Sequence, residues 1–208
     1  LSKKLFTKNN ILTPKYVKFE FKKNIIKKNI IKLIKKKLDF PVVVKPINEG
    51  SSVNVYICNK SNLINNLYKL QNYGEVLIEK FIPGREIQVA IFGSQKLGVI
   101  ELKPKRKFYD YEAKYNPKAK TEHIIPVKIS KKNYNKVTDL ALKAHNILKC
   151  RGVTRSDFRF YNNKFYLLET NTQPGMTSLS LVPEIASYKG IKFIQLIEKI
   201  IKDASLNR

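Results

Sequence analysis

Two pairs of short strand-like segments constrain the fold of this chain more than any other feature. Glu86–Phe92 is followed by Leu97–Leu102, and Val153–Tyr161 is followed by Phe165–Asn171, with only a few residues inside each pair. Such short connections are typical of β-hairpins, in which the two strands run antiparallel. Because helical patterns occur between these hairpins along the chain, we expect an α+β fold.

Three segments have the pattern of helices that pack one face against a sheet. Lys22–Leu38 places its Ile and Leu residues on one broad helical face, with most of its lysines opposite. Ser130–Leu148 begins with a serine that can cap a helix N-terminus. Residues 191–203 predict a closing amphipathic helix.

A boundary between two subdomains is expected at Pro83-Gly84. Short apolar runs at Pro41–Lys45 and Val76–Phe81 predict strands before this dipeptide, and Pro-Gly breaks regular structure. Residues 1–83 would then form a small subdomain, and residues 84–208 a C-terminal one.

The charge of the chain raises the question of a nucleic-acid partner. The net charge is +25, but only six of the 41 basic residues are arginine, and the lysines are spread over the whole length. Arginine is the residue that contacts phosphate and guanine in bidentate fashion. The mixture of Lys, Asn and Ile is what an AT-rich coding sequence produces. We therefore interpret the charge as a solvated surface and expect no specific nucleic-acid partner.

A membrane location is not expected either. No apolar run approaches the roughly 18–20 residues that span a bilayer. The basic segment Lys22–Leu38 could lie on an anionic membrane, but a packed helix with a solvated lysine face is the simpler interpretation. The chain begins at Leu1 without a methionine or a signal-peptide pattern, so we expect part of a longer soluble protein.

The second hairpin carries residues that can bind a metal ion. Glu169 and Asn171 alternate along a strand and project on one face, about 7 Å apart. A three-residue turn, Asn162–Lys164, would place Asp157 opposite Glu169, with Arg155 beside it. Carboxylate and amide oxygens suit Mg²⁺. The alternative is a set of surface strand residues joined by ion pairs.

A second candidate site follows an earlier strand. Lys45 ends the strand, and the turn Glu49–Ser52 contains small residues whose backbone N–H groups can hold phosphate. The spacing is not that of a P-loop, and a plain hairpin turn is the alternative.

Two further segments have the composition of functional loops. Phe108–Tyr115 is rich in aromatic and charged residues within a long connection, which is typical of a lid. Asn171–Thr177 opens from a strand end into a Pro-Gly turn, whose amides could support an oxyanion, and Ser180 follows closely.

Together these segments resemble the signature blocks of the D-alanine–D-alanine ligase family. The likeness rests on V-V-K-P with E-G-S-S-V at 43–53, F-Y-D-Y-E-A-K-Y at 108–115, R-S-D at 155–157 and L-E-T-N-T-Q-P-G-M-T at 168–177, in the family's order. It implies an ATP-grasp fold in which the nucleotide lies between two α+β subdomains. It also implies that the family's N-terminal domain, which completes the first substrate site, should precede Leu1. The family's turn usually ends in glycine, where this chain has Asn54, a residue that tolerates positive φ.

The resemblance implies a role for each matching residue. Nucleotide contacts fall on Lys45, Glu79, Lys80, Ile82, Glu86 and Lys114. Catalytic roles fall on Arg155, Ser51, Tyr115 and Gly175, of which Arg155 and the Gly175 amide would stabilise the tetrahedral oxyanion. Substrate contacts fall on Tyr109, Ser180 and Leu181, of which Ser180 and Leu181 would hold the carboxylate of the second D-alanine. Metal contacts fall on Asp157, Glu169 and Asn171.

The implied reaction joins two D-alanines in the cytoplasm for peptidoglycan synthesis. ATP phosphorylates the first carboxylate, and the second amine displaces phosphate, with two Mg²⁺ ions (or Mn²⁺) as cofactors. The family's enzymes are expected as homodimers when complete. Two alternatives stay open: another ATP-grasp carboxylate–amine ligase, with D-lactate or D-serine among the possible second substrates, and a nucleotide-binding remnant without catalysis.

Overall fold

The structure is a computed structural model that describes residues 1–21, 27–50, 52–104, 121–177 and 180–204. The described chain forms two compact units. One contains Pro14–Ile82 and is here called the four-stranded unit; the other contains Leu1–Thr13, Pro83–Lys103 and the residues from Glu122 onward, and is called the five-stranded unit. The chain passes between the units next to the expected boundary at Pro83-Gly84. Residues 1–13, expected in the small subdomain, instead group with the five-stranded unit.

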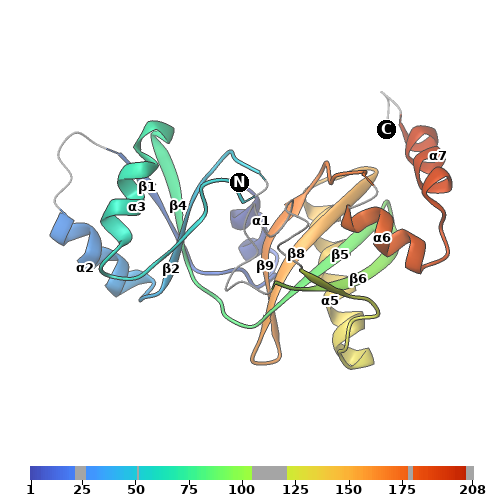
Figure 1. Cartoon of the computed structure of the whole chain (residues 1–208), viewed down its shortest axis with the longest axis horizontal. Helices are drawn as coiled ribbons and strands as arrows, with labels where there is room; N and C mark the ends of the chain where they lie inside the picture. Colours follow the sequence, from blue (N-terminus) through green and yellow to red (C-terminus); the bar gives the residue numbers. More distant parts are fainter. Residues whose placement is uncertain (22–26, 51, 105–120, 178–179, 205–208) are drawn as a thin grey trace. The chain divides into compact units, whose positions relative to one another are not determined.

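The four-stranded unit is an antiparallel sheet covered by helices. Its strands follow the order β1-β4-β2-β3. The elements are β1 (Tyr16–Glu20), α2 (Lys27–Lys37), β2 (Val42–Pro46), β3 (Tyr56–Cys58), α3 (Leu63–Lys69), the 3₁₀ helix η1 (Gln71–Tyr73) and β4 (Glu75–Lys80). Figure 1 shows α2 and α3 beside this sheet.

Strand alternation explains how this sheet separates a core from a polar face. Val42 and Val44 of β2 are fully buried and pack with Ile34 of α2 and Leu63 of α3. Lys45, one residue after Val44, points to the other face, because successive side chains of a strand point to opposite sides. The sheet therefore offers one face to its helices and the other to a candidate site.

The five-stranded unit is a second antiparallel sheet, in the order β7-β6-β5-β8-β9. Its elements are α1 (Ser2–Lys8), β5 (Arg85–Phe92), β6 (Gln95–Lys103), β7 (Glu122–Ile124), α5 (Lys131–Ile147), β8 (Val153–Tyr161), β9 (Lys164–Asn171), α6 (Leu181–Tyr188) and α7 (Phe193–Asp203). Both predicted hairpins are present, as β5–β6 and β8–β9. Since every strand pair in both units is antiparallel, the expected α+β class is confirmed.

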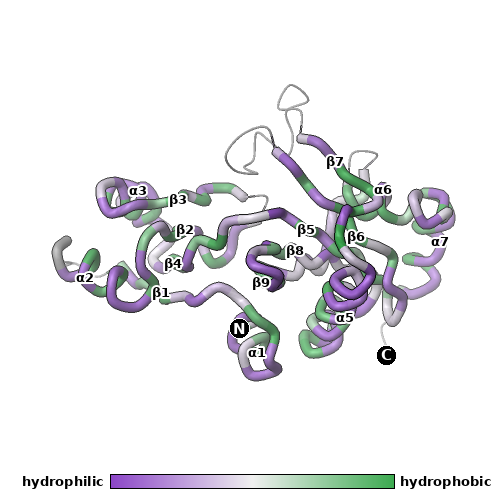
Figure 2. The backbone as a smooth tube through the Cα atoms, turned by 90° about the horizontal axis from the view of Figure 1, so that it is seen from below, coloured by the Kyte–Doolittle hydropathy of each residue, from purple (hydrophilic) through white to green (hydrophobic). Residues whose placement is uncertain are grey.

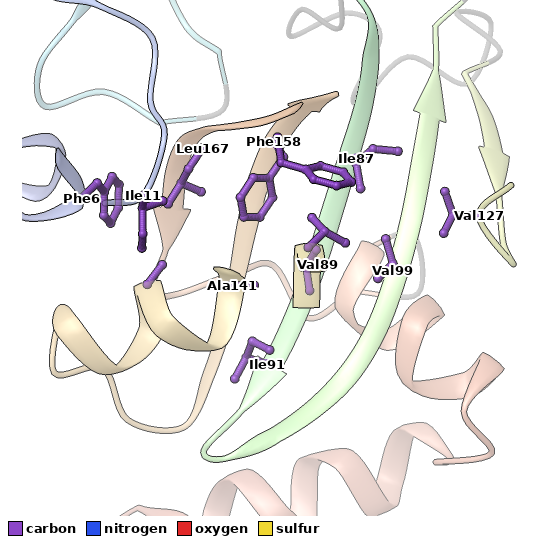
Figure 3. Close-up of a cluster of buried hydrophobic side chains, with 13 residues drawn as sticks. Phe6, Ile11, Ile87, Val89, Ile91, Val99, Val127, Ala141, Phe158 and Leu167 are labelled. Carbon is purple, nitrogen blue, oxygen red and sulfur yellow. The ribbon is translucent and has the colours of Figure 1, made fainter. Parts of the chain in front are cut away.

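The core of this unit lies between α5 and one face of the sheet. Ile87, Val89 and Ile91 alternate along β5 and pack with Ala141 of α5 and Phe158 of β8 (Figure 3). Figure 2 shows hydrophobic and hydrophilic residues alternating along α5, as its sequence predicts. The predicted cap is also present, because the Ser130 side chain accepts a hydrogen bond from the Asn133 amide.

Residues 1–13 belong to this unit because they complete its core and its sheet edge. Phe6 and Ile11 are buried in the cluster beside Leu167 (Figure 3). The Leu167 amide donates to the Leu12 carbonyl at 2.8 Å, and the Thr13 hydroxyl donates to the Leu167 carbonyl at 2.8 Å. These partners are about 155 positions apart in sequence, so local patterns do not reveal them.

The opposite face of the sheet is partly covered by α6. Ile100 and Leu102 alternate with the core residue Val99 on β6 and are buried on the other side. A Cβ at Gly98 would lie 2.9 Å from a methyl group of Ile185 in α6, so glycine allows the helix to approach β6 closely. Figure 2 shows β6 between α5 and α6. The part of this face over β5, β8 and β9 carries the polar residues described below. Within the described residues, no helix is both long and apolar enough to cross a membrane.

Burial of His145 predicts a dependence of stability on pH. The side chain is 2 % exposed in α5, where Nδ1 lies 2.9 Å from the Thr154 hydroxyl, and desolvation lowers its pKa. Below the ordinary histidine pKa of about 6.5, the unfolded chain binds a proton that the folded chain resists. We expect the free energy of unfolding to fall between pH 7.5 and 5.5, by at most about 1.4 kcal/mol per pH unit from this residue. Urea unfolding at several pH values gives this free energy for the parent and for His145→Gln, and we expect it to depend less on pH in the variant. An equal pH dependence in both proteins would contradict the role given to His145.

Candidate active site

The β8–β9 hairpin differs from the predicted one in its turn and in one irregularity. Tyr161 pairs with Lys164, so the turn has two residues, Asn162 and Asn163, and the expected three-residue turn is wrong. Both asparagines have positive φ, 47° and 57°, as the tight hairpin turn with the strand twist requires. Further along, Phe158 pairs with Leu167 but Asp157 pairs with Glu169, so Leu168 is an extra residue in β9.

This β-bulge changes the face on which the end of β9 displays its side chains. Leu167 is fully buried in the core beside Phe158. Without the extra residue, Glu169 would point to the same core, because it is two positions further on. The bulge instead aligns Glu169 with Asp157 and Asn171 with Arg155, and paired residues share a face. The predicted pairing of Asp157 with Glu169 is therefore confirmed, although it arises in a different way.

Arg155 and Asp157 form a bidentate ion pair on this face. The Arg155 Nε and Nη2 groups donate to the two Asp157 carboxylate oxygens at 2.7 and 2.9 Å. The Asp157 side chain is almost fully buried and that of Arg155 largely so. A buried carboxylate needs such a partner, since an uncompensated charge inside a protein is costly. Arg155 therefore lies against the carboxylate, closer than the edge position that the sequence suggested.

The oxygen donors on this face are of the chemical type that binds a hard divalent cation, and the sheet register places them on one face. Asp157 and Glu169 face each other across the strands, and Asn171 follows on the same face. The Asn171 Oδ1 atom also accepts a hydrogen bond from the Gln173 amide at 2.9 Å, which holds the amide group in place. Two carboxylates and an amide oxygen are ligands that Mg²⁺ prefers. Among the described residues, no group of three or more His, Cys, Asp or Glu side chains is arranged to hold a metal ion.

The neighbouring strand β5 adds two buried polar residues to the same face. Glu86 is 8 % exposed, and its carboxylate accepts a hydrogen bond from Arg159 Nη1 at 3.2 Å. Gln88, 1 % exposed, pairs with Asp157 in the sheet register, and its amide nitrogen lies 3.5 Å from a Glu86 oxygen. Sequence reasoning missed Gln88 and Arg159. Two polar residues separated by one position, Glu86 and Gln88, in the otherwise largely apolar segment 85–92 were the signal that could have revealed this second polar face.

In the four-stranded unit, the structure brings Lys45 and Glu79 together. The Lys45 ammonium lies 3.2 Å from a Glu79 carboxylate oxygen, and the Glu79 side chain is 4 % exposed. Lys80 of the same strand donates its ammonium protons to the carbonyls of Phe40 and Asp39, at 3.1 and 3.4 Å. Ile82 follows β4 and is half-buried. A lysine, a carboxylate and an apolar residue thus lie around the end of β4 and the facing part of β2.

The turn before β3 shows how Asn54 fits a position where the resemblance led us to expect glycine. Asn54 has a φ of 56°, the left-handed region that asparagine tolerates. Its side chain donates to the Tyr73 hydroxyl at 2.8 Å and accepts from the Tyr56 hydroxyl at 3.0 Å. Tyr73 in turn donates to a Glu49 carboxylate oxygen at 3.1 Å. These contacts join the start of the turn to β3 and η1.

Substitutions at Asn54 should separate backbone strain from the loss of these contacts. Asn54→Gly and Asn54→Ala both remove the side-chain hydrogen bonds, but only alanine resists positive φ, at a cost of roughly 1–2 kcal/mol. We expect Asn54→Ala to unfold at lower urea concentration than Asn54→Gly. Equal midpoints would mean that the turn relaxes to negative φ when the side chain is removed.

The loop after β9 places Gly175 against Ser180. A Cβ at Gly175 would lie only 2.9 Å from the Ser180 hydroxyl oxygen, so a larger residue here would displace that hydroxyl. Leu181, the first residue of α6, is buried. Four further residues that the sequence singled out, Ser51, Tyr109, Lys114 and Tyr115, lie outside the described residues.

Comparisons with known proteins agree with these motifs. A family model described as D-ala D-ala ligase C-terminus matches residues 5–202. The D-alanine–D-alanine ligase of Pelagibacter ubique (strain HTCC1062) is 69% identical over 208 residues, which is 100% of this chain and 68% of that protein.

Two solved structures show the same fold. The D-alanine–D-alanine ligase from Bacillus anthracis complexed with ATP has a TM-score of 0.79 and 29% identity, over 97% of this chain and 63% of that one. The VanG D-Ala:D-Ser ligase from Enterococcus faecalis has a TM-score of 0.82 and 26% identity, over 97% and 59%. The expected ATP-grasp fold is thereby confirmed, and the chain spans about two thirds of the length of the proteins it matches.

The family model covers nearly the whole chain, and the relative from Pelagibacter ubique is identical at more than two thirds of the positions. Both findings assign the chain to the same family. The chain belongs to the D-alanine–D-alanine ligase family and corresponds to its C-terminal part.

Proposed function

We propose that the protein containing this chain joins two D-alanine molecules into D-alanyl-D-alanine with ATP, for peptidoglycan precursor synthesis. The observation that carries the proposal is the polar face of the five-stranded sheet. There the bulge in β9 aligns Glu169 and Asn171 with Asp157 and Arg155, in a chain whose relatives bear the name of this ligase. Such a face combines oxygen donors for a metal with a fixed cation, which transfer of a phosphoryl group requires.

The nucleotide would be bound by the residues that the motifs assign to it. Lys45 supplies a positive charge for phosphate, and its pairing with Glu79 holds the ammonium in place. Lys80, Ile82 and Glu86 are the further residues assigned to adenine and ribose, and Lys114 to phosphate. The solved relative from Bacillus anthracis was crystallised with ATP, which supports a nucleotide site in this fold.

Asp157, Glu169 and Asn171 would hold magnesium, with two ions as the number implied by the family. Bound magnesium supplies positive charge that neutralises the phosphate oxygens during transfer. Arg155 stays within hydrogen-bond distance of Asp157 in this role, so its guanidinium is a positioned cation beside the metal ligands.

The reaction has two bond exchanges. A carboxylate oxygen of the first D-alanine attacks the γ-phosphorus of ATP, which forms an acyl phosphate and releases ADP. The neutral amine of the second D-alanine then attacks the acyl carbon, loses a proton, and phosphate leaves with the electrons of the C–O bond. Arg155 and the Gly175 amide stabilise the tetrahedral oxyanion, while Ser180 and Leu181 bind the second carboxylate. Ser51, Tyr109 and Tyr115 are assigned to the substrate sites by the motifs alone.

D-Alanine is proposed as the second substrate because the 69% identical relative carries that name. The likeness to the VanG D-Ala:D-Ser ligase makes D-serine the second candidate, at 26% identity. We also propose that the complete protein is cytoplasmic, since ATP and D-alanine are present there. A homodimer is proposed for the complete protein from the family resemblance.

The test is a dipeptide assay with the full-length protein. We expect ADP release only when ATP, Mg²⁺ and D-alanine are all present, with D-alanyl-D-alanine as the product identified by mass. D-Serine and D-lactate, each added with D-alanine, serve as competing second substrates. ATP binding without any dipeptide would favour the nucleotide-binding remnant, and a mixed product would favour the other second substrate.

A further inference from the structure

The side chain of Ser180 is held in an unusual direction for its place in the fold. Ser180 is the N-cap residue of α6, a position where serine normally accepts a hydrogen bond from an amide of the first helical turn. Here the side chain makes no such cap. Its hydroxyl oxygen instead contacts Thr177 and lies against Gly175.

Thr177 binds Ser180 through three contacts. The Thr177 amide donates to the Ser180 hydroxyl oxygen at 3.0 Å, and the two hydroxyl oxygens lie 2.9 Å apart. The Ser180 amide donates to the Thr177 carbonyl at 2.9 Å. The two residues thus form a closed hydrogen-bonded ring, and Gly175 leaves the space that the Ser180 hydroxyl occupies.

The hydrogen-bonding capacity of a serine hydroxyl determines where the Ser180 proton can point in this ring. A serine hydroxyl has one proton to donate and two lone pairs to accept with. The Thr177 amide uses one lone pair, and the Thr177 hydroxyl uses the second when it donates. The Ser180 proton is then directed away from Thr177, as a donor for an anionic group. A carboxylate is such a group, because it accepts hydrogen bonds and donates none.

We propose that Thr177 is a positioning residue for the second substrate, fixing the Ser180 hydroxyl as a donor to the substrate carboxylate. This role rests on the proposed function, in which Ser180 binds that carboxylate. Thr177 itself does not touch the substrate; it acts through Ser180. The consequence is specific: loss of the Thr177 hydroxyl affects binding of the second D-alanine and leaves phosphoryl transfer from ATP intact.

The experiment is a double-mutant cycle in the full-length protein. Initial rates over a wide range of D-alanine concentration give separate KM values for the two D-alanine sites. Thr177→Val keeps the branched shape and the backbone amide but removes the hydroxyl. We expect it to raise the second KM about tenfold, which corresponds to about 1.4 kcal/mol. The kcat and the KM for ATP should stay within about twofold of the parent, because neither depends on this hydrogen bond.

Two further variants make the result decisive. Thr177→Ser retains the hydroxyl and should keep the second KM within about threefold of the parent. In the Ser180→Ala background, Thr177→Val should have no further effect, since a residue that acts only through Ser180 loses its influence when that hydroxyl is absent.

Three outcomes would overturn the proposal: an unchanged second KM in Thr177→Val, additive effects in the double variant, or a Thr177→Ser variant as impaired as Thr177→Val. An inactive parent protein would overturn the proposed function instead, and the role of Thr177 with it. If the parent forms dipeptide normally and the Thr177→Val variant is unaffected, the proposed function stands and only the role given to Thr177 is wrong.

Discussion

Arg155→Met in the full-length protein should reduce the rate of dipeptide formation about 10²–10³-fold, because losing one charge-stabilising contact to an oxyanion costs roughly 3–4 kcal/mol in the barrier. The guanidinium is held in place before any substrate binds, by two hydrogen bonds to Asp157 at 2.7 and 2.9 Å. Methionine has similar length and no charge, so the variant removes the cation while largely filling its space. Steady-state kinetics at saturating ATP and D-alanine measure the effect.

Arg159→Met is the matched control for this prediction. Arg159 lies four residues further along the same strand and on the same face, and it pairs with Glu86 at 3.2 Å. Both variants remove one positive charge from the sheet, but of the two arginines only Arg155 adjoins the carboxylates proposed to bind the metal. We expect Arg159→Met to act mainly on nucleotide affinity, through Glu86. An equal loss of kcat in both variants would show that overall charge, and not the position of Arg155, is responsible.

Lys45→Ala should weaken ATP binding by on the order of 1–3 kcal/mol, or roughly 5- to 150-fold in Kd. Two effects act in the same direction. The ammonium is lost from the phosphate site, and the carboxylate of Glu79, only 4 % exposed in its side chain, loses its partner at 3.2 Å. A buried carboxylate that has lost this neighbouring positive charge would repel the nucleotide phosphates. Calorimetric titration of the full-length protein with ATP and Mg²⁺ measures the change.

Two variants separate these contributions. Adding Glu79→Gln to Lys45→Ala removes the negative charge that Lys45 no longer offsets, so part of the affinity should return. Lys18→Ala removes another lysine of the same sheet, one whose partner is the exposed Glu75, and should leave Kd unchanged. ATP affinity that is unaffected in Lys45→Ala, or unaffected when EDTA removes the metal, would contradict the assigned site.

The pairing of Asp157 with Glu169 could be predicted from the sequence, but the geometry that produces it could not. The alternation of side chains along the two strands predicted the correct partners because two errors in the prediction cancel. The turn is one residue shorter than expected, and Leu168 adds one residue to β9 before Glu169. Leu168 is an ordinary strand residue, so nothing in the local pattern marks a bulge there. The face on which Glu169 lies depends on that bulge, and therefore on the register of the assembled sheet.

Contacts between distant segments set a second limit on prediction from sequence. The first 13 residues belong to the five-stranded unit because Phe6 and Ile11 enter its core and Leu12 bonds to Leu167 of β9. No periodicity within residues 1–13 specifies that partner. Gln88 was missed for a related reason: Glu86 and Gln88 are only two alternating polar residues, and they indicate a polar sheet face only once the pairing of Gln88 with Asp157 is known.

The most direct test of the central claim follows the carboxylate oxygen of the first substrate. Full-length protein is incubated with ATP, Mg²⁺ and D-alanine labelled with ¹⁸O in its carboxylate, and the released phosphate is analysed by mass. If the carboxylate is activated as an acyl phosphate, the phosphate formed with each dipeptide must contain one ¹⁸O atom from D-alanine. Dipeptide formation with unlabelled phosphate would contradict the account, because the carboxylate oxygen would then never have been bonded to phosphorus.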